Sequence, residues 1–521
     1  MKTTYITTPI YYASGNVHIG NSYSTIVCDC FNRYKKLKGN DTYYLTGMDE
    51  HGQKIESKAL SLGKTPQALV DEVALSTKEL WKNLKITNDD FIRTSEIRHI
   101  EVVQQVFEDL LQKGDIYLSE YEGDYCVNDE SFFTKTQMKE EGVCPDCGRS
   151  TIKVKEESYF LKLKKYEDRL LKFIEDNPDF IQPVSRKNEV VSFIKQGLED
   201  LCVSRTSFKW GISVLSNPKH VVYVWIDALT NYISALGYNS KDNSLYQKYW
   251  ENGDEVYHVV GKDILRFHAI YWPIMLMALN VPIKFKLMAH GWLLIKDGKM
   301  GKSLGNAVYP MDIVNQYGLD ALRYYLIREM PLGNDGNFTY ERFYERYNVD
   351  LANDLGNLVS RSISMINKYL NGKVVKPTNI TSLDKSVEDL ANEVVTKYNQ
   401  NFDSFLFQNG LIEVWNLISR ANKYIDETAP WVLAKDLARS EELASVMYHL
   451  YEVLRLVAIM ISPVLVDASE VILEELGLSK EQFNTENLIF GNTSDAIVTK
   501  NPIILFKRLD IAEELKKNAW N

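Results

Sequence analysis

Two short segments of the sequence carry side chains that can act on phosphate groups. The first, VHIGN, holds His18 and Asn21 after a β-branched run, where the opening of a helix supplies unpaired N–H groups and a favourable field for an anion. The second, KMGKS, places Lys299 and Lys302 beside glycines, as a cationic arm that neutralises charge growing during displacement at phosphorus. Taken singly, the first is more simply explained as a surface or capping histidine, and the second as a solvated loop.

The cysteines indicate metal binding rather than disulfide bonds. Six cysteines in 521 residues are too few for a disulfide framework, and three of them, Cys126, Cys144 and Cys147, fall within 22 consecutive residues. Cys144 and Cys147 form a C-x2-C pair followed by glycine, which directs two thiolates at one tetrahedral ion.

The elements that must position these residues begin with a strand, a turn and a helix. Residues 3–8 are β-branched and aromatic, and a small polar loop leads from them into a helical pattern that runs to about Lys38. A short strand at 41–47 and a helical stretch at 65–84 follow. This alternation predicts a doubly wound α/β domain around a parallel sheet.

The alternation of strand and helix patterns changes twice further along the chain. Residues 117–220 contain short segments rich in Tyr, Gly and Cys, and the earlier rhythm returns at 221–229 and 255–263, so we interpret 117–220 as an insertion in a split domain. After about residue 350 the pattern becomes long amphipathic helices, with no strand signal until about residue 500. The carboxyl third is therefore predicted to be a helix bundle.

Composition excludes several classes of protein. With 45% hydrophobic and 25% charged residues, 27 Gly and 14 Pro, the 521-residue chain is neither collagen-like nor mainly disordered, and it is too long for one small binding module. Its net charge of −10 means that any contact with nucleic acid must use a local basic face. The best apolar stretch, 453–466, is short and contains Arg455, and the amino end has no apolar signal core, so we expect a cytoplasmic protein without a membrane span.

Together, the two phosphate segments resemble the HIGH and KMSKS signatures of class I aminoacyl-tRNA synthetases, and the match extends along nearly the whole chain to the methionyl-tRNA synthetases. Two positions depart from the signatures: Asn21 replaces the last His of HIGH, and Gly301 replaces the Ser of KMSKS. By this resemblance the chain is a methionine–tRNA ligase, which forms methionyl-adenylate from L-methionine and ATP and transfers the methionyl group to the terminal adenosine of tRNA(Met). The blocks that carry the resemblance are PIYYASGNVHIG, TGMDEHGQKI, VYVWIDALTNYI, VYHVVGKDILRFHAIYWP, AHGWLLIKDGKMGKSLGN, NDLGNLVSR and ETAPWVLAKD.

The resemblance also implies a methionine pocket of aromatic and aliphatic walls, which suit a polarizable thioether. Asp49 is the implied partner of the ammonium group, and Tyr12 and His268 are the implied readers of the sulfur. Two groups of these residues, at 225, 229 and 232 and at 264, 268 and 272, have helical spacing. Each group shares one helix face if its segment is helical, and spacing alone favours plain core packing for both. The implied pocket residues are Ile10, Tyr12, Asp49, Trp225, Leu229, Tyr232, Ile264, His268 and Trp272.

For ATP, the chemistry requires positioning and charge stabilisation rather than a protein nucleophile, with Mg²⁺ bound to the leaving pyrophosphate. His51, which follows Asp49 in MDEHG, is expected to be structural. The resemblance assigns the catalytic roles to His18, Asn21, Lys299 and Lys302. The implied ATP-binding residues are His18, Asn21, Gly261, Asp263, Lys299, Lys302 and Ser303.

Many relatives place a four-ligand zinc knuckle in this insertion, and the resemblance therefore implies one structural Zn²⁺ per chain. Here the predicted ligands are Cys126, Asp129, Cys144 and Cys147, with Asp129 where a second cysteine is usual. The alternative is a metal-free knuckle with free thiols.

The resemblance assigns the CAU anticodon to the helical third, where side chains can hydrogen bond to bases and stack on them. The implied residues are Asn353, Asn357, Arg361, Pro430 and Trp431. Without the resemblance, the stripe at 353, 357 and 361 is better explained as an exposed polar face, and the alternative for Trp431 is a core residue of the bundle.

The whole chain is therefore predicted to be α/β, with a split Rossmann-type catalytic domain, an inserted zinc-knuckle domain and an all-α anticodon-binding bundle. Because the chain stops soon after the bundle, a monomer is expected. Two alternatives stay open: a class I synthetase for another apolar amino acid, and a non-catalytic RNA-binding relative. The predicted domains are 1–116 (catalytic, first half), 117–220 (inserted connective domain), 221–290 (catalytic, second half), 291–349 (KMSKS loop and stem contact) and 350–521 (anticodon binding).

Overall fold

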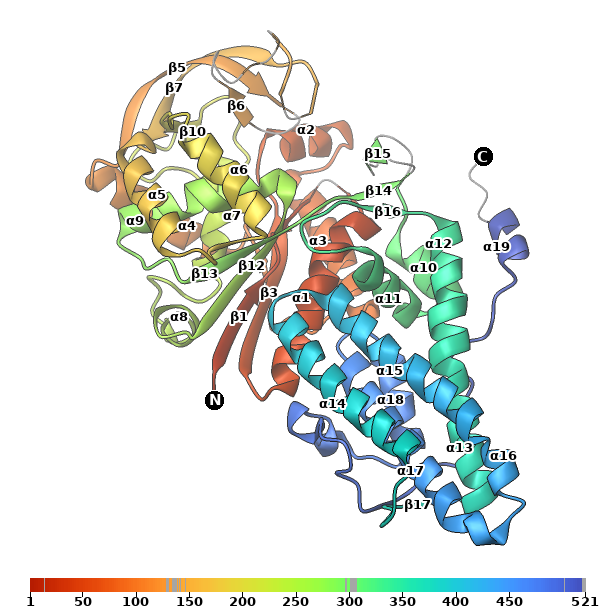
Figure 1. Cartoon of the computed structure of the whole chain (residues 1–521). Coiled ribbons are helices and arrows are strands. Elements are labelled where there is room, and N and C mark those ends of the chain that lie inside the picture. The colour runs from red at the N-terminus through yellow and green to blue at the C-terminus, as the bar shows by residue number, and fades with distance from the viewer. Residues whose placement is uncertain are drawn as a thin grey trace. The chain divides into compact units, whose positions relative to one another are not determined.

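The structure is a computed structural model in which the chain divides into two compact units (Figure 1). The first unit holds residues 1–17 and 41–290, and the second holds residues 18–40 and 291–521. Of the predicted site residues, Asp129, Lys302 and Ser303 lie outside the residues that the structure describes, as does Gly301. The described residues are 1–13, 15–127, 131–133, 138, 140, 142–145, 147–295, 298–299, 307–500 and 502–517.

A seven-stranded parallel sheet is the centre of the first unit. Its order is β2-β3-β1-β12-β13-β8, and β4 also pairs with β3. Every pairing is parallel, as βαβ alternation predicts. Figure 1 shows β3, β1, β12 and β13 running side by side. The strands are β1 (Thr3–Thr7), β2 (Tyr11–Tyr12), β3 (Asp41–Asp49), β4 (Asp90–Arg93), β8 (Ile181–Gln182), β12 (Glu255–Gly261) and β13 (Phe285–His290).

The central strands are buried along most of their length because both faces of a parallel sheet are covered. In β12, every residue from Val256 to Gly261 is buried. Parallel strands end at the same edge of the sheet, and ligands of such folds bind beyond that edge. Asp49, Gly261 and His290 are the last residues of β3, β12 and β13.

The helices of the first unit begin where the sequence signals them. α3 follows Thr65, whose side chain accepts the Ala68 N–H, and has Pro66 as its first residue. The segment 221–229 contains only the short strand β11 (Val221–Val222) before α7 begins at Val224. The helices are α2 (Gln53–Ser61), α3 (Pro66–Asn83), α4 (Ile97–Gln112), α5 (Glu167–Asp176), α6 (Val184–Ile194), α7 (Val224–Ser234), α8 (Ser244–Tyr246) and α9 (Trp272–Leu279).

A separate antiparallel sheet occupies the segment predicted to be an insertion. β5 (Ile116–Cys126) and β7 (Ile152–Leu161) pair over ten residues and form the long ribbon visible in Figure 1. β6 (Ser131–Phe133) and β9 (Leu201–Cys202) complete the sheet, and β10 (Ser204–Arg205) pairs with β11. Cys126 ends β5, so the ribbon brings the cysteine segment to its tip.

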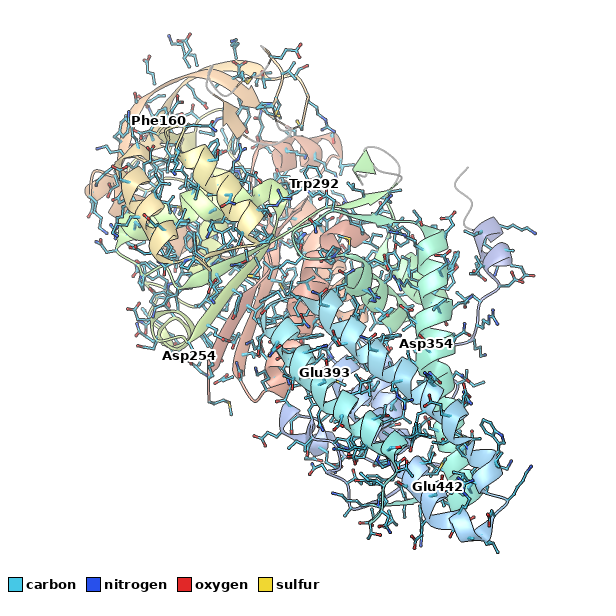
Figure 2. All side chains as sticks on the ribbon, in the orientation of Figure 1. Phe160, Asp254, Trp292, Asp354, Glu393 and Glu442 are labelled. Carbon is cyan, nitrogen blue, oxygen red and sulfur yellow. The ribbon has the colours of Figure 1, made fainter. Side chains whose placement is uncertain are left out.

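The second unit is mainly helical, and polar side chains such as Glu393 on α14 remain exposed (Figure 2). A small sheet has the order β15-β14-β16. Its elements are α1 (Ile19–Leu37), α10 (Pro310–Tyr317), α11 (Leu319–Glu329), α12 (Tyr340–Arg346), the π-helix η6 (Tyr347–Gly356), α13 (Asn357–Leu370), α14 (Ser382–Asp403), α15 (Phe407–Thr428), α16 (Pro430–Leu433), α17 (Ser440–Ile461), α18 (Val466–Glu475), α19 (Ile511–Lys517), β14 (Leu293–Ile295), β15 (Gly298–Lys299) and β16 (Gly336–Phe338).

The prediction of no strand between residues 350 and 500 is wrong. β17 (Lys373–Val375) and β18 (Asp495–Ile497) form an antiparallel pair in the second unit. Three residues are too few to show the alternation that identifies a strand in a sequence.

One helix among the described residues, Leu437–Ile461, is long and apolar enough to cross a membrane by length and composition. This helix begins upstream of residues 453–466, the apolar stretch noted in the sequence analysis. Of its most apolar window, 94% is buried inside the structure, and α17 packs against α13, α14, α15 and α18. Its pattern is therefore that of the central helix of a bundle.

Polar pairs and aromatic packing attach α1 to the second unit, where the Phe31 ring lies 3.9 Å from that of Phe405. The fully buried Arg323 on α11 donates to Asp29 at 2.7 Å and to the carbonyl oxygens of Pro463 and Val464. Lys35 and Lys38, near the end of α1, both pair with Asp403 of α14. A buried charge requires such partners, and they fix the orientation of α1.

Candidate active site

A buried hydroxyl–imidazole pair lies among aromatic rings in the first unit. Tyr232 donates its hydroxyl to Nε2 of His268 at 2.7 Å, and Nδ1 of His268 donates to the Ile264 carbonyl oxygen at 2.9 Å. Burial lowers the pKa of His268 to about 4, so the imidazole is neutral at pH 7. Both ring nitrogens of His268 are therefore hydrogen bonded.

Four further rings surround this pair. Trp225 stacks on Phe267 with ring centroids 3.7 Å apart, and the rings of Tyr232 and Trp272 lie 5.9 Å apart. His258 stacks on Tyr232 at 4.0 Å. We call Trp225, Tyr232, Phe267, His268 and Trp272 the aromatic cluster. Leu229, also predicted for this site, is buried on the same helix as Tyr232.

Sequence reasoning missed Phe267, although it adjoins His268 in an aromatic run. It also treated the spacing of Ile264, His268 and Trp272 as α-helical. The structure instead has a 3-10 turn at Lys262–Ile264 and a π-helix at Phe267–Tyr271 before α9. Pro273, which follows the π-helix in α9, has no N–H to donate to the carbonyl four residues earlier.

Asp49 lies at the carboxyl end of β3, where β2 pairs with it. Tyr12 and Asp49 are register partners, and the Ala13 N–H donates to the Asp49 carbonyl oxygen at 2.9 Å. Lys54 lies over the Tyr12 ring, and Ile10 packs against the same buried core as Trp225 and Ile264. The strand pairing thus brings two predicted methionine residues, Tyr12 and Asp49, side by side at one edge of the sheet.

The structure contains a contact between two histidines and a buried carboxylate that the sequence did not predict. Asp227 on α7 accepts from His51 Nδ1 and His99 Nε2, both at 2.7 Å. The available signal is an acidic residue within an otherwise apolar helix, VWIDALTNYI, which indicates a buried charge with partners. His51, for which a structural role is predicted, therefore binds a buried carboxylate.

In the second unit, His18 and Asn21 cap the amino end of α1. Nδ1 of His18 accepts the Asn21 N–H, and Oδ1 of Asn21 accepts the His18 N–H, which forms a capping box. A Cβ at Gly20 would lie 3.0 Å from the His18 ring. Because Nδ1 is the acceptor, a neutral His18 carries its proton on Nε2 and can donate it.

Gly261 ends β12 and precedes a tight turn that contains Asp263. A Cβ at Gly261 would lie 2.5 Å from Oδ1 of Asp263, so only glycine leaves that carboxylate where it is. Lys299 lies on β15, opposite Leu294 of β14 in the small sheet of the second unit.

The three clustered cysteines come together as predicted. Their sulfur atoms all lie within 4.8 Å of one another, and those of Cys126 and Cys147 are 3.6 Å apart. Tetrahedral zinc with Zn–S bonds of ~2.3 Å separates its sulfurs by about 3.8 Å. The backbone also has the form of a knuckle, since Gly148, at φ 71°, donates its N–H to the Cys144 carbonyl oxygen. These residues fit a zinc ion.

The predicted anticodon residues reach the surface of the second unit, with one exception. Asn353 and Asn357 are exposed, although Asn353 lies on the π-helix η6 rather than on α13. Arg361 pairs with Asp426 at 2.9 Å. Pro430 is the buried first residue of α16, whereas Trp431 is 43% exposed, which excludes a fully packed core position for it.

Comparison with known proteins agrees with this architecture. The family described as tRNA synthetases class I (M) matches residues 4–155 and 147–363. The fold and the sites therefore define a class I aminoacyl-tRNA synthetase. The anticodon binding domain of methionyl tRNA ligase matches residues 376–518. The chain belongs to the methionyl-tRNA synthetase family, whose members are methionine–tRNA ligases, and the resemblance drawn from the sequence motifs is confirmed.

Individual relatives are similar over almost the whole chain. The methionine–tRNA ligase of Oceanobacillus iheyensis is 56% identical over 98% of this chain and 77% of its own length, and that of Bacillus subtilis is 54% identical over 99% and 79%. The crystal structure of Mycobacterium tuberculosis methionyl-tRNA synthetase bound by methionyl-adenylate is 37% identical, with a TM-score of 0.92 over 97% of this chain and all of that one. These likenesses also confirm the predicted fold class.

Proposed function

We propose that the chain activates L-methionine with ATP, releases pyrophosphate and transfers the methionyl group to the terminal adenosine of tRNA(Met). The observations that carry the proposal are the neutral Tyr232–His268 pair inside the aromatic cluster and the position of Asp49 at the carboxyl end of β3. A solved relative with the same fold binds methionyl-adenylate. Polarizable aromatic walls suit a thioether, and a carboxylate suits its ammonium group.

In this proposal Asp49 binds the ammonium group of methionine. The aromatic cluster encloses the side chain, and the remaining contacts come from the predicted pocket residues of β2, α7 and the turn after β12. Because both nitrogens of His268 are hydrogen bonded, we assign recognition of the sulfur to ring contacts rather than to a hydrogen bond from His268. The proposed methionine residues are Ile10, Tyr12, Asp49, Trp225, Leu229, Tyr232, Ile264, His268 and Trp272.

ATP is assigned to two sets of residues. The amino end of the 19-residue helix α1 attracts phosphate, and Nε2–H of His18 is the donor for a phosphate oxygen. Gly261 and Asp263 are assigned to the nucleoside. Mg²⁺ enters with ATP as its counterion. The family signatures add Asn21, Lys299, Lys302 and Ser303 to the phosphate-binding residues.

We assign the cysteine cluster to one structural zinc ion. Cys126, Cys144 and Cys147 supply three thiolates, and Asp129 is the proposed fourth ligand. Zinc held by four protein ligands would stabilise the turn at the tip of the β5–β7 ribbon and leave no open position for catalysis.

The anticodon is assigned to the surface that contains Asn353, Asn357, Arg361 and Trp431, with Pro430 setting the start of α16. Exposed amides, a guanidinium and an indole are the groups that read single-stranded bases. We further propose that the protein acts as a monomer in the cytoplasm, where translation consumes its product, and that the five sequence segments defined above are its functional domains.

The test is methionine-dependent exchange of labelled pyrophosphate into ATP. We expect exchange with methionine, and exchange only with another amino acid, or none at all, would contradict the proposal. Asp49→Asn should lower kcat/KM for methionine about a hundredfold, because an unpaired buried ammonium costs ~3 kcal/mol. Asp41→Asn is the matched control: Asp41 opens the same strand, pairs with Lys248 and Tyr249, and should leave exchange unchanged.

A further inference from the structure

α7 has two polar attachments on the face opposite its aromatic residues. At 100° per residue, Trp225, Leu229 and Tyr232 share one face, while Asp227 and Ser234 lie about 180° away. The first face belongs to the proposed methionine site. The second is fully buried against other elements of the first unit.

Asp227 is the centre of these attachments. Its side chain is inaccessible to solvent and accepts from both His51 Nδ1 and His99 Nε2. Burial raises the pKa of Asp227, but attraction to His51 and hydrogen bonds from both histidines outweigh that effect and leave the pKa below its usual value. Since an ionised carboxylate only accepts, each imidazole presents an N–H to it.

His51 comes from the segment that holds Asp49, whereas His99 attaches α7 to α4. His51 follows Asp49 by two residues at the end of β3. The segment around it is held from its other side by Trp210, which donates to the Glu50 carbonyl oxygen and accepts the Gly52 N–H. His99 lies in the first turn of α4, and its Nδ1 is 2.7 Å from the Ser234 hydroxyl at the end of α7.

We propose that Asp227 is a positioning residue for methionine, which fixes the distance between the Asp49 segment and the aromatic face of α7 by binding His51 and His99 together. This inference rests on the proposed function, because Asp49 and the aromatic face are its methionine contacts. Side chains that orient the groups of a site in this way affect substrate binding without touching the substrate.

A purely structural role makes a different prediction. Removing one partner of a buried ion pair destabilises the fold, because it leaves a buried charge without compensation, and it therefore mainly reduces the amount of folded enzyme. Such a loss would lower kcat and leave the KM values unchanged. Loss of positioning would instead raise the KM for methionine, with the KM for ATP unchanged.

The experiment is pyrophosphate-exchange kinetics of Asp227→Asn in the full chain. We expect kcat/KM for methionine to fall at least tenfold, mainly through KM, while the KM for ATP stays within twofold. Asp115→Asn is the matched control, because Asp115 is another buried aspartate of the same unit and pairs with Lys165. It should leave both KM values unchanged. Equal behaviour of the two variants would overturn the inference.

His99 provides a second pair of variants that settles the matter if Asp227→Asn fails to fold. Glutamine places an N–H close to the position of Nε2, so His99→Gln should keep the KM for methionine within threefold, whereas His99→Ala should raise it at least fivefold. In Asp227→Asn, nitrogen NMR of labelled histidines should show a tautomer change, because the amide donates to one imidazole. Equal KM values for the two His99 variants would refute the positioning role. Absence of exchange in the unmodified chain would refute the proposed function instead.

Discussion

Replacement of Trp431 by alanine separates RNA recognition from methionine activation. The Trp431 indole is 43% exposed on the four-residue helix α16, so its removal leaves no closed cavity. Stacking of one base on an aromatic ring is worth ~1–3 kcal/mol. We therefore expect aminoacylation efficiency to fall at least about tenfold, which corresponds to ~1.4 kcal/mol.

Trp415 is the matched control in the same unit. It is 6% exposed, its ring lies 4.6 Å from that of Tyr324, and its indole N–H donates to the Asp350 carbonyl oxygen at 3.2 Å. Its truncation to alanine leaves a cavity that costs ~3–5 kcal/mol, so Trp415→Ala should lower thermal stability and every activity together.

Three assays on both variants decide the matter: pyrophosphate exchange, aminoacylation of tRNA and the melting temperature. Trp431→Ala should retain normal exchange and an unchanged melting temperature, with the loss confined to aminoacylation. Unimpaired aminoacylation would refute the stacking role. A parallel loss of exchange and of thermal stability would show that Trp431 is a packing residue despite its exposure.

Three other predictions concern the remaining sites. Because the pKa of His268 is about 4 in the fold and ~6.5 when unfolded, its stabilisation is complete above pH 6.5 and is lost as the pH falls toward 4; urea titrations should show a loss of about 2 kcal/mol between pH 7 and pH 5 that is missing in His268→Gln. Gly261→Ala should displace the Asp263 carboxylate and raise the KM for ATP about tenfold in exchange kinetics, and an unchanged KM would refute the nucleoside assignment. Elemental analysis should find one zinc per chain, and less than one in Cys147→Ser; a zinc-free unmodified chain would contradict the assigned site.

Strands and helices were predicted correctly where the sequence pattern extends over enough residues to be recognised. The run at the start of the chain became β1, and the predicted helix at 65–84 became α3 within one residue at each end, because Thr65 and Pro66 mark its beginning. The strands β17 and β18 were missed because three-residue strands depend on their partner, which is more than a hundred residues away. The attachments of α1 to the second unit include Arg323 and Asp403, and no local pattern contains such partners.

Only those contacts of the site that depend on local sequence could be predicted. The C-x2-C pair and Cys126 did converge, because short spacing and a long antiparallel ribbon leave few alternatives. The Asp227 network joins three segments that are distant in sequence, and single-sequence spacing gives no information on such contacts. The π-helix before α9 shows a further limit: a spacing of four residues indicates a face only while the helix stays α-helical.

In the proposed site, we expect the histidines of the aromatic surroundings to select against polar substrates, because their ring nitrogens are already hydrogen bonded. His268 uses Nδ1 on a carbonyl oxygen and Nε2 on Tyr232, and Trp272 donates its indole N–H to Nε2 of the buried His258. Burial also lowers the pKa of His258, so neither histidine carries charge at pH 7. In the proposed site, a glutamine side chain of similar length would lose its hydrogen bonds to water without finding a replacement in these histidines, which costs more than a lost methylene contact. A thioether makes no strong hydrogen bonds and incurs no such loss, so histidines whose ring nitrogens are already hydrogen bonded favour methionine over polar side chains of the same shape.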